Sequence, residues 1–197
     1  MIDKVSIIIP FYRNLKYLSQ TIKSVQKQSY KNYEIILIYD DEDKSDLKVI
    51  KNKFKNLKKL IIIENKKNLG AAKSRNIGIS KSKGKYIAFL DDDDLWIDTK
   101  LATQVAALSS SDAKICYSDM FLEYQGWKRY FKCVSDDDFY LSLLKQGFGI
   151  CTSVLLISTT AIRRCCTTQL TLWVPTAAGT TTTPSPRSLT PTAATVS

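Results

Sequence analysis

Histidine is absent from the 197 residues, and the five cysteines are odd in number and irregularly spaced, with no Cys-x-x-Cys pair. Without histidine, the Ser-His-Asp and Cys-His arrangements are excluded, so any proton transfer must fall to carboxylates, lysine, tyrosine or cysteine. The cysteine pattern argues against both a disulfide framework and a zinc site. The absence of histidine thus narrows the side chains that can act in catalysis to these few types.

Long hydrophobic runs are also missing. No apolar stretch approaches the roughly 20 residues that cross a bilayer, and the amino terminus lacks the charged, apolar and cleavage regions of a signal peptide. With 44% hydrophobic and 24% charged residues, the composition is typical of a globular protein, and the length favours one substantial domain. We therefore expect a cytoplasmic protein without a transmembrane helix.

The last part of the chain lacks acids and lysine. No Asp or Glu follows Asp138, no lysine follows Lys145, and Thr, Ala, Pro and Ser dominate beyond about residue 155. We expect one domain over residues 1–155 and a disordered tail over residues 156–197. Our hypothesis is that the coding sequence leaves its reading frame near residues 155–160. A linker or glycosylated stalk is the competing interpretation, although stalks belong on exported proteins.

The net charge of +10 comes from 29 basic and 19 acidic residues. Such a charge attracts polyanions, either nucleic acid or an anionic membrane surface. Much of the lysine falls within residues 44–85, on the expected outer faces of helices and in turns, without interleaved aromatic residues. We therefore expect no nucleic-acid partner. A basic surface module that binds anionic lipid or nucleic acid remains an alternative.

Short apolar runs alternate with amphipathic segments along the chain. The apolar runs are β-branched and have no polar face, which predicts strands that are buried on both sides. The segments between them repeat apolar residues at helical spacing, and Asn14 can cap the first helix. This alternation predicts an α/β fold, a mostly parallel sheet with helices on both faces. Strands are expected at 5–12, 33–39, 60–63, 86–90 and 114–117, helices at 15–25, 47–57, 71–80 and 101–108, and an extended segment at 121–131.

Acidic residues follow two of the expected strands: Asp40-Asp41 and the run from Asp91 to Asp94. In open parallel sheets, ligands bind beyond the carboxyl ends of the strands. Four consecutive aspartates repel one another, and a divalent cation would relieve that repulsion. Asp91 and Asp93 have the spacing to hold Mg²⁺ or Mn²⁺ against a diphosphate. A solvated acidic turn, with Asp93 or Asp94 capping a helix, is the alternative.

Two segments, in order, resemble family 2 glycosyltransferases with a GT-A (Rossmann-like) fold. VSIIIPFYRN resembles the family's first strand and the loop at the nucleotide edge, and it contains Pro10 and Phe11. YEIILIYDDEDKSD resembles the second strand, with Asp40 in the place of the aspartate that contacts the nucleotide base; a simple turn residue is the alternative. The family usually continues with Gly or Asn and then Ser, whereas this chain has Asp41-Glu42, which leaves that loop's conformation open.

A third segment, NLGAAKSRNIGISKSKGKYIAFLDDDDLW, is the most specific. It resembles the family's Gly-x-x-x-Ala-Arg-Asn-x-Gly helix followed by its metal-binding Asp-x-Asp loop, with Ser74 in place of the alanine. Arg75 presents a planar fork of donors to a nucleotide, although a surface charge is the alternative. One crossover separates Arg75 from Asp91, so both side chains are expected at the same edge of the sheet.

The resemblance implies an enzyme that transfers a sugar from a nucleotide-diphosphate sugar, first of all a UDP-sugar, to an acceptor hydroxyl with inversion. It also implies a saccharide or lipid-linked acceptor, a part in polysaccharide biosynthesis, and peripheral contact with the inner face of the membrane. The metal would be Mg²⁺ or Mn²⁺. The residues implied are Pro10, Phe11, Asp40, Arg75 and Asp92 for the nucleotide, and Asp91 and Asp93 for the metal.

Such a reaction needs a carboxylate base that deprotonates the acceptor on the face opposite the leaving diphosphate. The family places this base in an acidic, tryptophan-containing segment far downstream, and ICTSVLLIS resembles the lead-in to it. The residues after this lead-in include no acid, so the catalytic residue is unknown. Asp119 and Asp136 to Asp138 read more simply as a loop acid and a helix start. A non-catalytic, metal-dependent nucleotide-binding fragment is the alternative function.

Overall fold

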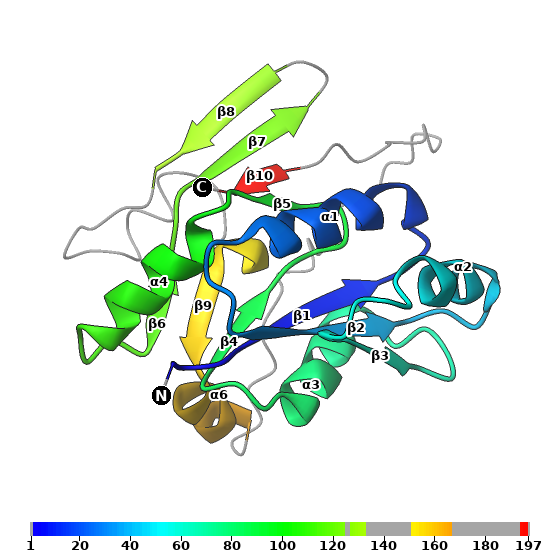
Figure 1. Cartoon of the computed structure of the whole chain (residues 1–197), viewed down its shortest axis with the longest axis horizontal. Helices are drawn as coiled ribbons and strands as arrows, with labels where there is room; N and C mark the ends of the chain where they lie inside the picture. Colours follow the sequence, from blue (N-terminus) through cyan, green and yellow to red (C-terminus); the bar gives the residue numbers. More distant parts are fainter. Residues whose placement is uncertain (1, 125–126, 133–150, 167–193, 197) are drawn as a thin grey trace, which may run out of the picture.

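The computed structural model describes residues 2–124, 127–132, 151–166 and 194–196 (Figure 1). Its centre is a six-stranded sheet with the order β3-β2-β1-β4-β9-β6. The first four strands in that order are parallel, β9 runs antiparallel to β4, and β6 runs antiparallel to β9. The strands are β1 (Val5–Phe11), β2 (Tyr33–Tyr39), β3 (Leu60–Glu64), β4 (Tyr86–Phe89), β6 (Ile115–Tyr117) and β9 (Leu155–Ser158).

Helices cover both faces of this sheet (Figure 1). On one face, α1 (Leu15–Lys27), α2 (Ser45–Lys53) and α4 (Lys100–Ser109) pack their apolar residues into the larger core. On the other face, α3 (Ala71–Lys81) and α6 (Thr159–Cys166) pack into a smaller core around Ile8 and Phe89. The predicted α/β fold, with a mostly parallel sheet and helices on both faces, is confirmed.

The central strands β1 and β2 are almost wholly buried, as their continuous apolar runs predict. The one acid in β2, Glu34, is buried, and its partners are the buried Ser6 and the half-exposed Lys4. Its carboxylate accepts hydrogen bonds from the Lys4 ammonium at 2.5 Å and the Ser6 hydroxyl at 2.6 Å. The backbone N–H of Lys83 donates a third, at 2.8 Å. A buried charge is tolerated here because its oxygens are paired.

A second sheet has the order β5-β10-β7-β8. The segment expected to be extended at 121–131 lies in the antiparallel pair β7 and β8. The end of the described chain, β10, pairs with both β5 and β7. The strands are β5 (Leu95–Trp96), β7 (Met120–Tyr124), β8 (Trp127–Phe131) and β10 (Ala194–Val196).

The described fold continues past residue 155, where the sequence predicts a disordered tail. The short 3-10 helix η1 (Thr152–Val154) leads into β9, which pairs with β4 on one side and β6 on the other. Helix α6 follows, and Ile162 is 9% exposed within the core of that face. Residues 156–166 are in regular structure because β9 gains hydrogen bonds along both edges, and residues 194–196 pair separately with β5 and β7 in the second sheet. Residues 167–193 lie outside the described part of the chain.

Helix α3 approaches β1 closely through a glycine. A β-carbon added at Gly78 would lie 2.4 Å from Cγ2 of Ile8, closer than any real contact. This close packing holds the second half of α3 against the middle of β1. Among the described residues, no helix is long and apolar enough to cross a membrane.

Candidate functional site

An open cavity of about 330 Å³ lies at the carboxyl ends of β1, β2 and β4. The end of β1, the loop after β2, the start of α3 and the loop after β4 form its wall. All seven of the residues singled out in the sequence for nucleotide or metal binding line it. The lining residues are Pro10, Phe11, Tyr12, Asp40, Asn68, Gly70, Ala71, Arg75, Asp91, Asp92 and Asp93.

Asp40 is 3% exposed and holds the loop before α3 in place. One carboxylate oxygen accepts hydrogen bonds from the Asn65 amide at 2.7 Å and from the N–H of Leu69 at 2.8 Å. The other oxygen accepts from the N–H of Gly70 at 2.8 Å, and Gly70 has a φ of +83° that suits glycine. A carboxylate offers about four acceptor positions, so one remains for a ligand. Asp40 is thus a buried anchor and not merely a turn residue.

Arg75, on α3, pairs with Asp91 in the loop after β4. Nη2 of Arg75 lies 2.5 Å from Oδ1 of Asp91, and the arginine side chain is only 12% exposed. Its Nε–H is buried and has no hydrogen-bond partner among the described residues. The alternative of a surface charge is therefore wrong for Arg75. An unpaired buried donor costs free energy, which a bound acceptor would recover.

Asp92 turns back toward the start of α1. Its carboxylate accepts hydrogen bonds from the N–H of Tyr12 at 3.2 Å and from the Asn14 amide at 3.0 Å. Burial raises the pKa of Asp92 to about 6, and these two bonds act against the rise. Asn14 does stand at the N-cap position of α1, but its side chain makes no capping bond. That part of the prediction is wrong, because the Asn14 amide donates instead to the half-buried carboxylate of Asp92.

Asp93 lines the cavity beside Asp91. Burial raises the pKa of Asp93, and the negative charge of Asp91 raises it further. Repulsion between neighbouring carboxylates is the condition that a divalent cation relieves. The loop runs directly into β5, and the next helix, α4, begins only at Lys100 after Thr99. Neither Asp93 nor Asp94 therefore caps a helix, and that part of the alternative is wrong, although the segment does form a half-exposed acidic turn.

A second potential metal-binding group shares Asp91. The ligand atoms of Asp91, Asp94 and Cys151 lie within 4.8 Å of one another. Burial, followed by the charge of Asp94, raises the pKa of the Cys151 thiol to about 11. A protonated thiol is a poor ligand, and Mg²⁺ and Mn²⁺ prefer oxygen. The donor set near Asp91 therefore suits a hard cation held by carboxylates.

The segment from Cys151 to Val154 contacts the acidic loop, although no sequence pattern indicates it. Ser153 Oγ accepts a hydrogen bond from the N–H of Asp91 at 3.0 Å, and the Thr152 hydroxyl donates to Oδ2 of Asp91 at 3.4 Å. Some 60 residues separate the partners, and no local pattern links them. A Ser-Val pair before an apolar strand is the nearest signal in the sequence, and it is too common to identify a site.

Two residues near α4 hold this segment from behind. The indole N–H of Trp96 donates to the carbonyl of Ser153 at 2.9 Å, and the Gln104 amide donates to that of Val154 at 2.8 Å. Lys100 lies 2% exposed between them. Its ammonium donates to Oε1 of Gln104 at 2.7 Å and lies 4.2 Å from the Trp96 ring centroid. Burial lowers the pKa of Lys100 to about 7.

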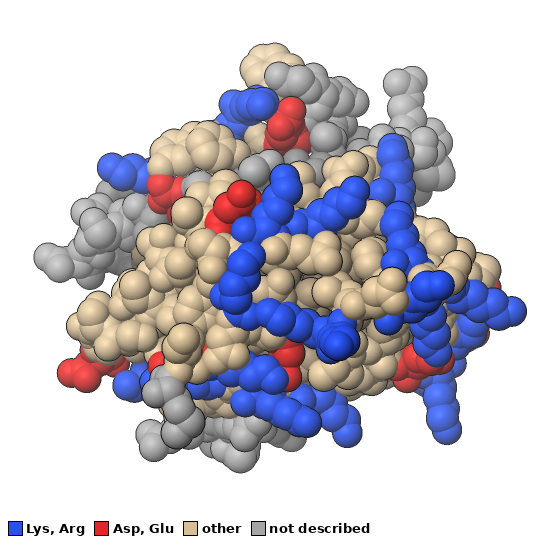
Figure 2. Space-filling view, in the orientation of Figure 1, with Lys and Arg blue, Asp and Glu red and all other residues tan. Residues whose placement is uncertain are grey.

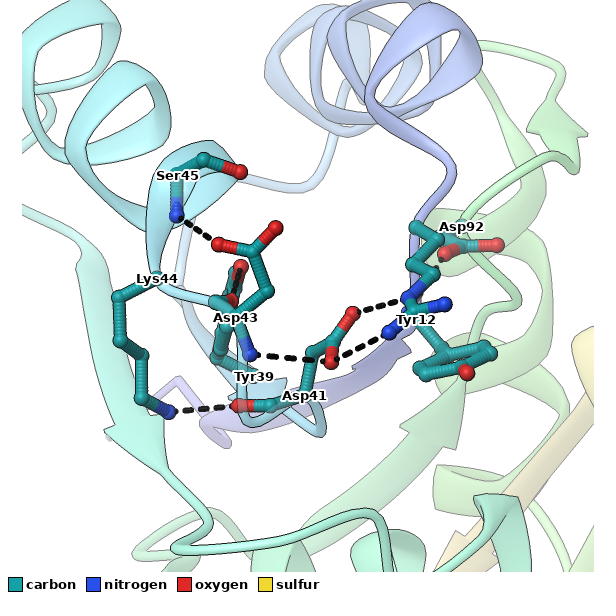
Figure 3. A network of polar contacts seen from close by, with 8 residues as sticks. Tyr12, Tyr39, Asp41, Asp43, Lys44, Ser45 and Asp92 are labelled. Atoms are coloured by element: carbon teal, nitrogen blue, oxygen red, sulfur yellow. Dashed lines mark hydrogen bonds and ion pairs between the residues drawn. The ribbon is translucent and has the colours of Figure 1, made fainter.

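The loop after β2, which departs from the family pattern at Asp41, is fixed by polar contacts (Figure 3). Asp41 is buried and forms a two-pronged pair with Arg13, at 2.6 Å from Nε and 3.2 Å from Nη2. This pair lowers the pKa of Asp41. The N–H of Asp43 donates to the same carboxylate, and the Lys44 ammonium donates to the backbone carbonyl of Asp41. The acid in place of the usual small residue thus closes the loop onto Arg13.

No candidate base is added by these contacts. Asp119 accepts a hydrogen bond from the Tyr130 hydroxyl beside the second sheet and is not among the residues that line the cavity. Asp136 to Asp138 lie outside the described residues.

The sequence profile described as "Glycosyl transferase family 2" matches residues 6–164, which is most of the chain. The chain belongs to this family. The match also reaches through β9 into α6, beyond the boundary expected at residue 155.

Named relatives agree with this assignment. The chain is 40% identical over 121 residues to "UDP-Glc:alpha-D-GlcNAc-diphosphoundecaprenol beta-1,3-glucosyltransferase WfaP" from Escherichia coli, covering 61% of this chain and 47% of that enzyme. A solved structure, S. aureus TarS 1-349 in complex with UDP-GlcNAc, is similar with a TM-score of 0.63 and 19% identity, over 82% of this chain and 47% of that one. Mannosyltransferase PcManGT from Pyrobaculum calidifontis, in complex with GDP-Man and Mn²⁺, gives 0.60 and 16%, over 82% and 46%. The chain thus spans less than half the length of each of these relatives.

Proposed function

We propose that the cavity binds a nucleotide-diphosphate sugar, a UDP-sugar first of all, together with Mg²⁺ or Mn²⁺, as part of a sugar-transfer reaction. The observation that carries the proposal is the unpaired Nε–H of Arg75, buried in a wall that it shares with the acidic loop. An arginine donor and clustered carboxylates suit opposite parts of one ligand, because a diphosphate needs donors and a cation needs oxygens. The relatives bound to UDP-GlcNAc and to GDP-Man with Mn²⁺ support this assignment.

Seven of the eleven lining residues have a proposed role. Asp40 has one acceptor position left, which suits an N–H of the nucleotide base, and Pro10 and Phe11 form the adjoining wall at the end of β1. Arg75 and Asp92 would contact the nucleotide from either side. Asp91 and Asp93 would hold the cation, with Asp94 close to Asp91. A bound cation would neutralise charge on the leaving diphosphate.

Transfer to an acceptor hydroxyl with inversion further requires a base. None of the described cavity residues is assigned that role, since the carboxylates there already hold the loops or the proposed cation. The relative named for a diphosphoundecaprenol-linked acceptor favours a lipid-linked saccharide as acceptor, and with it polysaccharide biosynthesis and peripheral contact with a membrane at its cytoplasmic face.

A second candidate function is metal-dependent nucleotide binding without transfer. It is favoured by one observation, the absence of any Asp or Glu after Asp138, where the family places its base. Detection of sugar transfer by this chain would exclude it.

Calorimetry with UDP, with and without Mn²⁺, tests the site. We expect binding that depends on Mn²⁺ and that weakens at least tenfold, or about 1.4 kcal/mol, in Asp93→Asn. Cys151→Ser is the matched control beside the same loop and should bind nearly as the parent protein does. Metal-independent binding, or equal binding by Asp93→Asn, would contradict the assignment. Loss of binding only in Cys151→Ser would move the cation to the group of Asp91, Asp94 and Cys151.

A further inference from the structure

The outer surface of α1 and α2 carries many more lysines than acids. Helix α1 contains three lysines and no acid, α2 contains three lysines and one acid, Asp46, and residues 54–60 add three lysines and no acid. Figure 2 shows basic side chains over the centre and right of the view, where Figure 1 draws α1 across the upper centre and α2 at the right. We call this the α1–α2 basic face. Its exposed lysines are Lys16, Lys23, Lys27, Lys48, Lys51, Lys53, Lys55 and Lys58.

A groove of about 300 Å³ opens within this face, separate from the cavity described above. Ser19, Lys23 and Gln26 line it from α1, where their spacing of four and three residues places them on one side of the helix. Lys53 and Phe54 line it from the end of α2. The groove is thus lined by one lysine from each helix and by the apolar side chains of Phe54 and Leu57.

The side chains of Ser19, Lys23 and Lys53 in the groove have no hydrogen bond or ion pair to the described residues. The Ser19 hydroxyl is buried without a hydrogen-bond partner among the described residues. No ion pair among the described residues includes Lys23 or Lys53. Lys51, which lies outside the groove, pairs with Glu64 at 2.6 Å. A buried hydroxyl between two uncompensated ammonium groups suits an anion with several oxygens, such as a phosphate ester.

We infer that the α1–α2 basic face docks onto an anionic phospholipid bilayer, with a headgroup phosphate in the groove between Lys23 and Lys53. The field of clustered lysines attracts an anionic surface, and the apolar groups beside them suit the interface. Phe54 lines the groove, and Val49 on α2 is 47% exposed. Nucleic acid is a poorer fit, because the face offers no row of exposed aromatic rings on which bases would stack.

The position of this face extends the proposed function. The inference rests on that function only where it assumes a lipid-linked acceptor. Both helices begin beside loops of the cavity: α1 follows Tyr12, which lines the cavity, and α2 follows the loop that begins at Asp40. Lys23 lies about 12 Å along the helix from the start of α1. A bilayer against this face would therefore bring a lipid-linked acceptor beside the edge of the cavity.

Co-sedimentation of the full chain with vesicles tests the inference. We expect binding to phosphatidylcholine vesicles that contain roughly one third phosphatidylglycerol, and little binding to phosphatidylcholine alone. Lys23→Gln combined with Lys53→Gln should weaken partitioning about 30-fold, because each lysine near an anionic surface contributes roughly a fivefold factor. Ser19→Ala should weaken it by about threefold through the lost hydroxyl.

Lys73→Gln combined with Lys81→Gln is the matched control, since it removes the same charge from the exposed side of α3 in the other helical layer. It should weaken partitioning by less than about threefold. Equal losses in the two double variants, or equal binding to both vesicle types, would overturn the inference. The inference would also be overturned if the Lys23 and Lys53 substitutions weakened binding of an oligonucleotide or of inorganic phosphate but left binding to vesicles unchanged. Calorimetry should give the same affinity for UDP with Mn²⁺ in the Lys23 and Lys53 variant as in the parent protein. The calorimetry therefore tests the proposed function, and the vesicle experiment tests the docking surface.

Discussion

The cavity at the carboxyl end of the sheet and the groove between α1 and α2 both gather charge, but they hold it in opposite ways. In the cavity, Asp40, Asp91 and Asp92 each have named partners within the chain, and Arg75 is nearly buried. In the groove, Lys23 and Lys53 are exposed and form no ion pair among the described residues. Fixed, partnered charges select a ligand by geometry, whereas exposed charges of one sign attract a surface through their field.

This difference predicts how substitutions act. A change in the cavity should alter affinity for one ligand, and its effect should depend less on salt because the groups there are buried or half-buried and held by partners. A change in the groove should alter attraction to anionic surfaces in proportion to charge, and salt should weaken that attraction. Three further predictions sharpen or break this comparison.

The largest effect on stability is expected at Lys100, whose side chain is buried. It has no acidic partner among the described residues, and burial lowers its pKa to about 7. The unfolded chain therefore binds more protons between pH 7 and about 10.5, so stability should rise with pH across that window. Lys100→Met should raise the free energy of unfolding by about 3 kcal/mol at pH 6.5, and by less than about 1 kcal/mol at pH 10. Urea unfolding at the two pH values measures this.

The same variant also serves as its own control, because only the pH dependence reports the buried ammonium. A loss of stability at both pH values would mean that the Trp96 ring and the Gln104 carbonyl stabilise the ammonium more than burial costs. In that case burial of the lysine would not be destabilising, and the contrast between the buried Lys100 and the exposed lysines would not hold.

A smaller effect is expected from Arg75→Lys. Lysine keeps the charge beside Asp91 but loses the buried Nε–H and the planar fork. Affinity for UDP with Mn²⁺ should fall about 30-fold, or about 2 kcal/mol. Arg13→Lys is the matched control, since Arg13 pairs with Asp41 but does not line the cavity. If calorimetry gave equal losses for both variants, Arg75 would have no particular place in the site.

The smallest effect is expected on folding when the groove lysines are changed. Lys23→Gln with Lys53→Gln should shift the free energy of unfolding by less than about 0.5 kcal/mol, because exposed charges without partners contribute little. Urea unfolding in low and high salt measures this. A loss above about 1.5 kcal/mol would show that these side chains hold α1 and α2 together, and the groove would then be structural.

Much of the candidate site could be predicted from the sequence because of one rule of parallel sheets. Pro10 and Phe11 are the last residues of β1, Asp40 follows β2 and Asp91 comes soon after β4. The carboxyl ends of parallel neighbours meet at one edge. The particular contacts could not be predicted in this way. Local sequence predicts that Asn14 caps α1, whereas its amide bonds to Asp92, a partner 78 residues away.

The extent of the fold was harder to predict for a similar reason. Composition changes near residue 155, and an expected boundary there follows from the loss of lysine and acids. Yet β9 lies between β4 and β6, and Ile162 is buried beneath the sheet. Composition indicates which segments favour contact with water. It does not indicate that β9 pairs with the free edge of β4, because that pairing depends on the rest of the sheet.

By itself, the sequence determined the alternation of strands and helices, and the presence of acids at the strand ends, because burial patterns and strand polarity are local properties. Only the tertiary structure decided that Ser153 and Thr152 would contact Asp91, and that Arg75 would keep an unpaired donor. It also decided that Lys100 would be buried while Lys23 and Lys53 remained outside. These outcomes depend on contacts between residues far apart in the chain, and no local spacing encodes the free energy of those contacts.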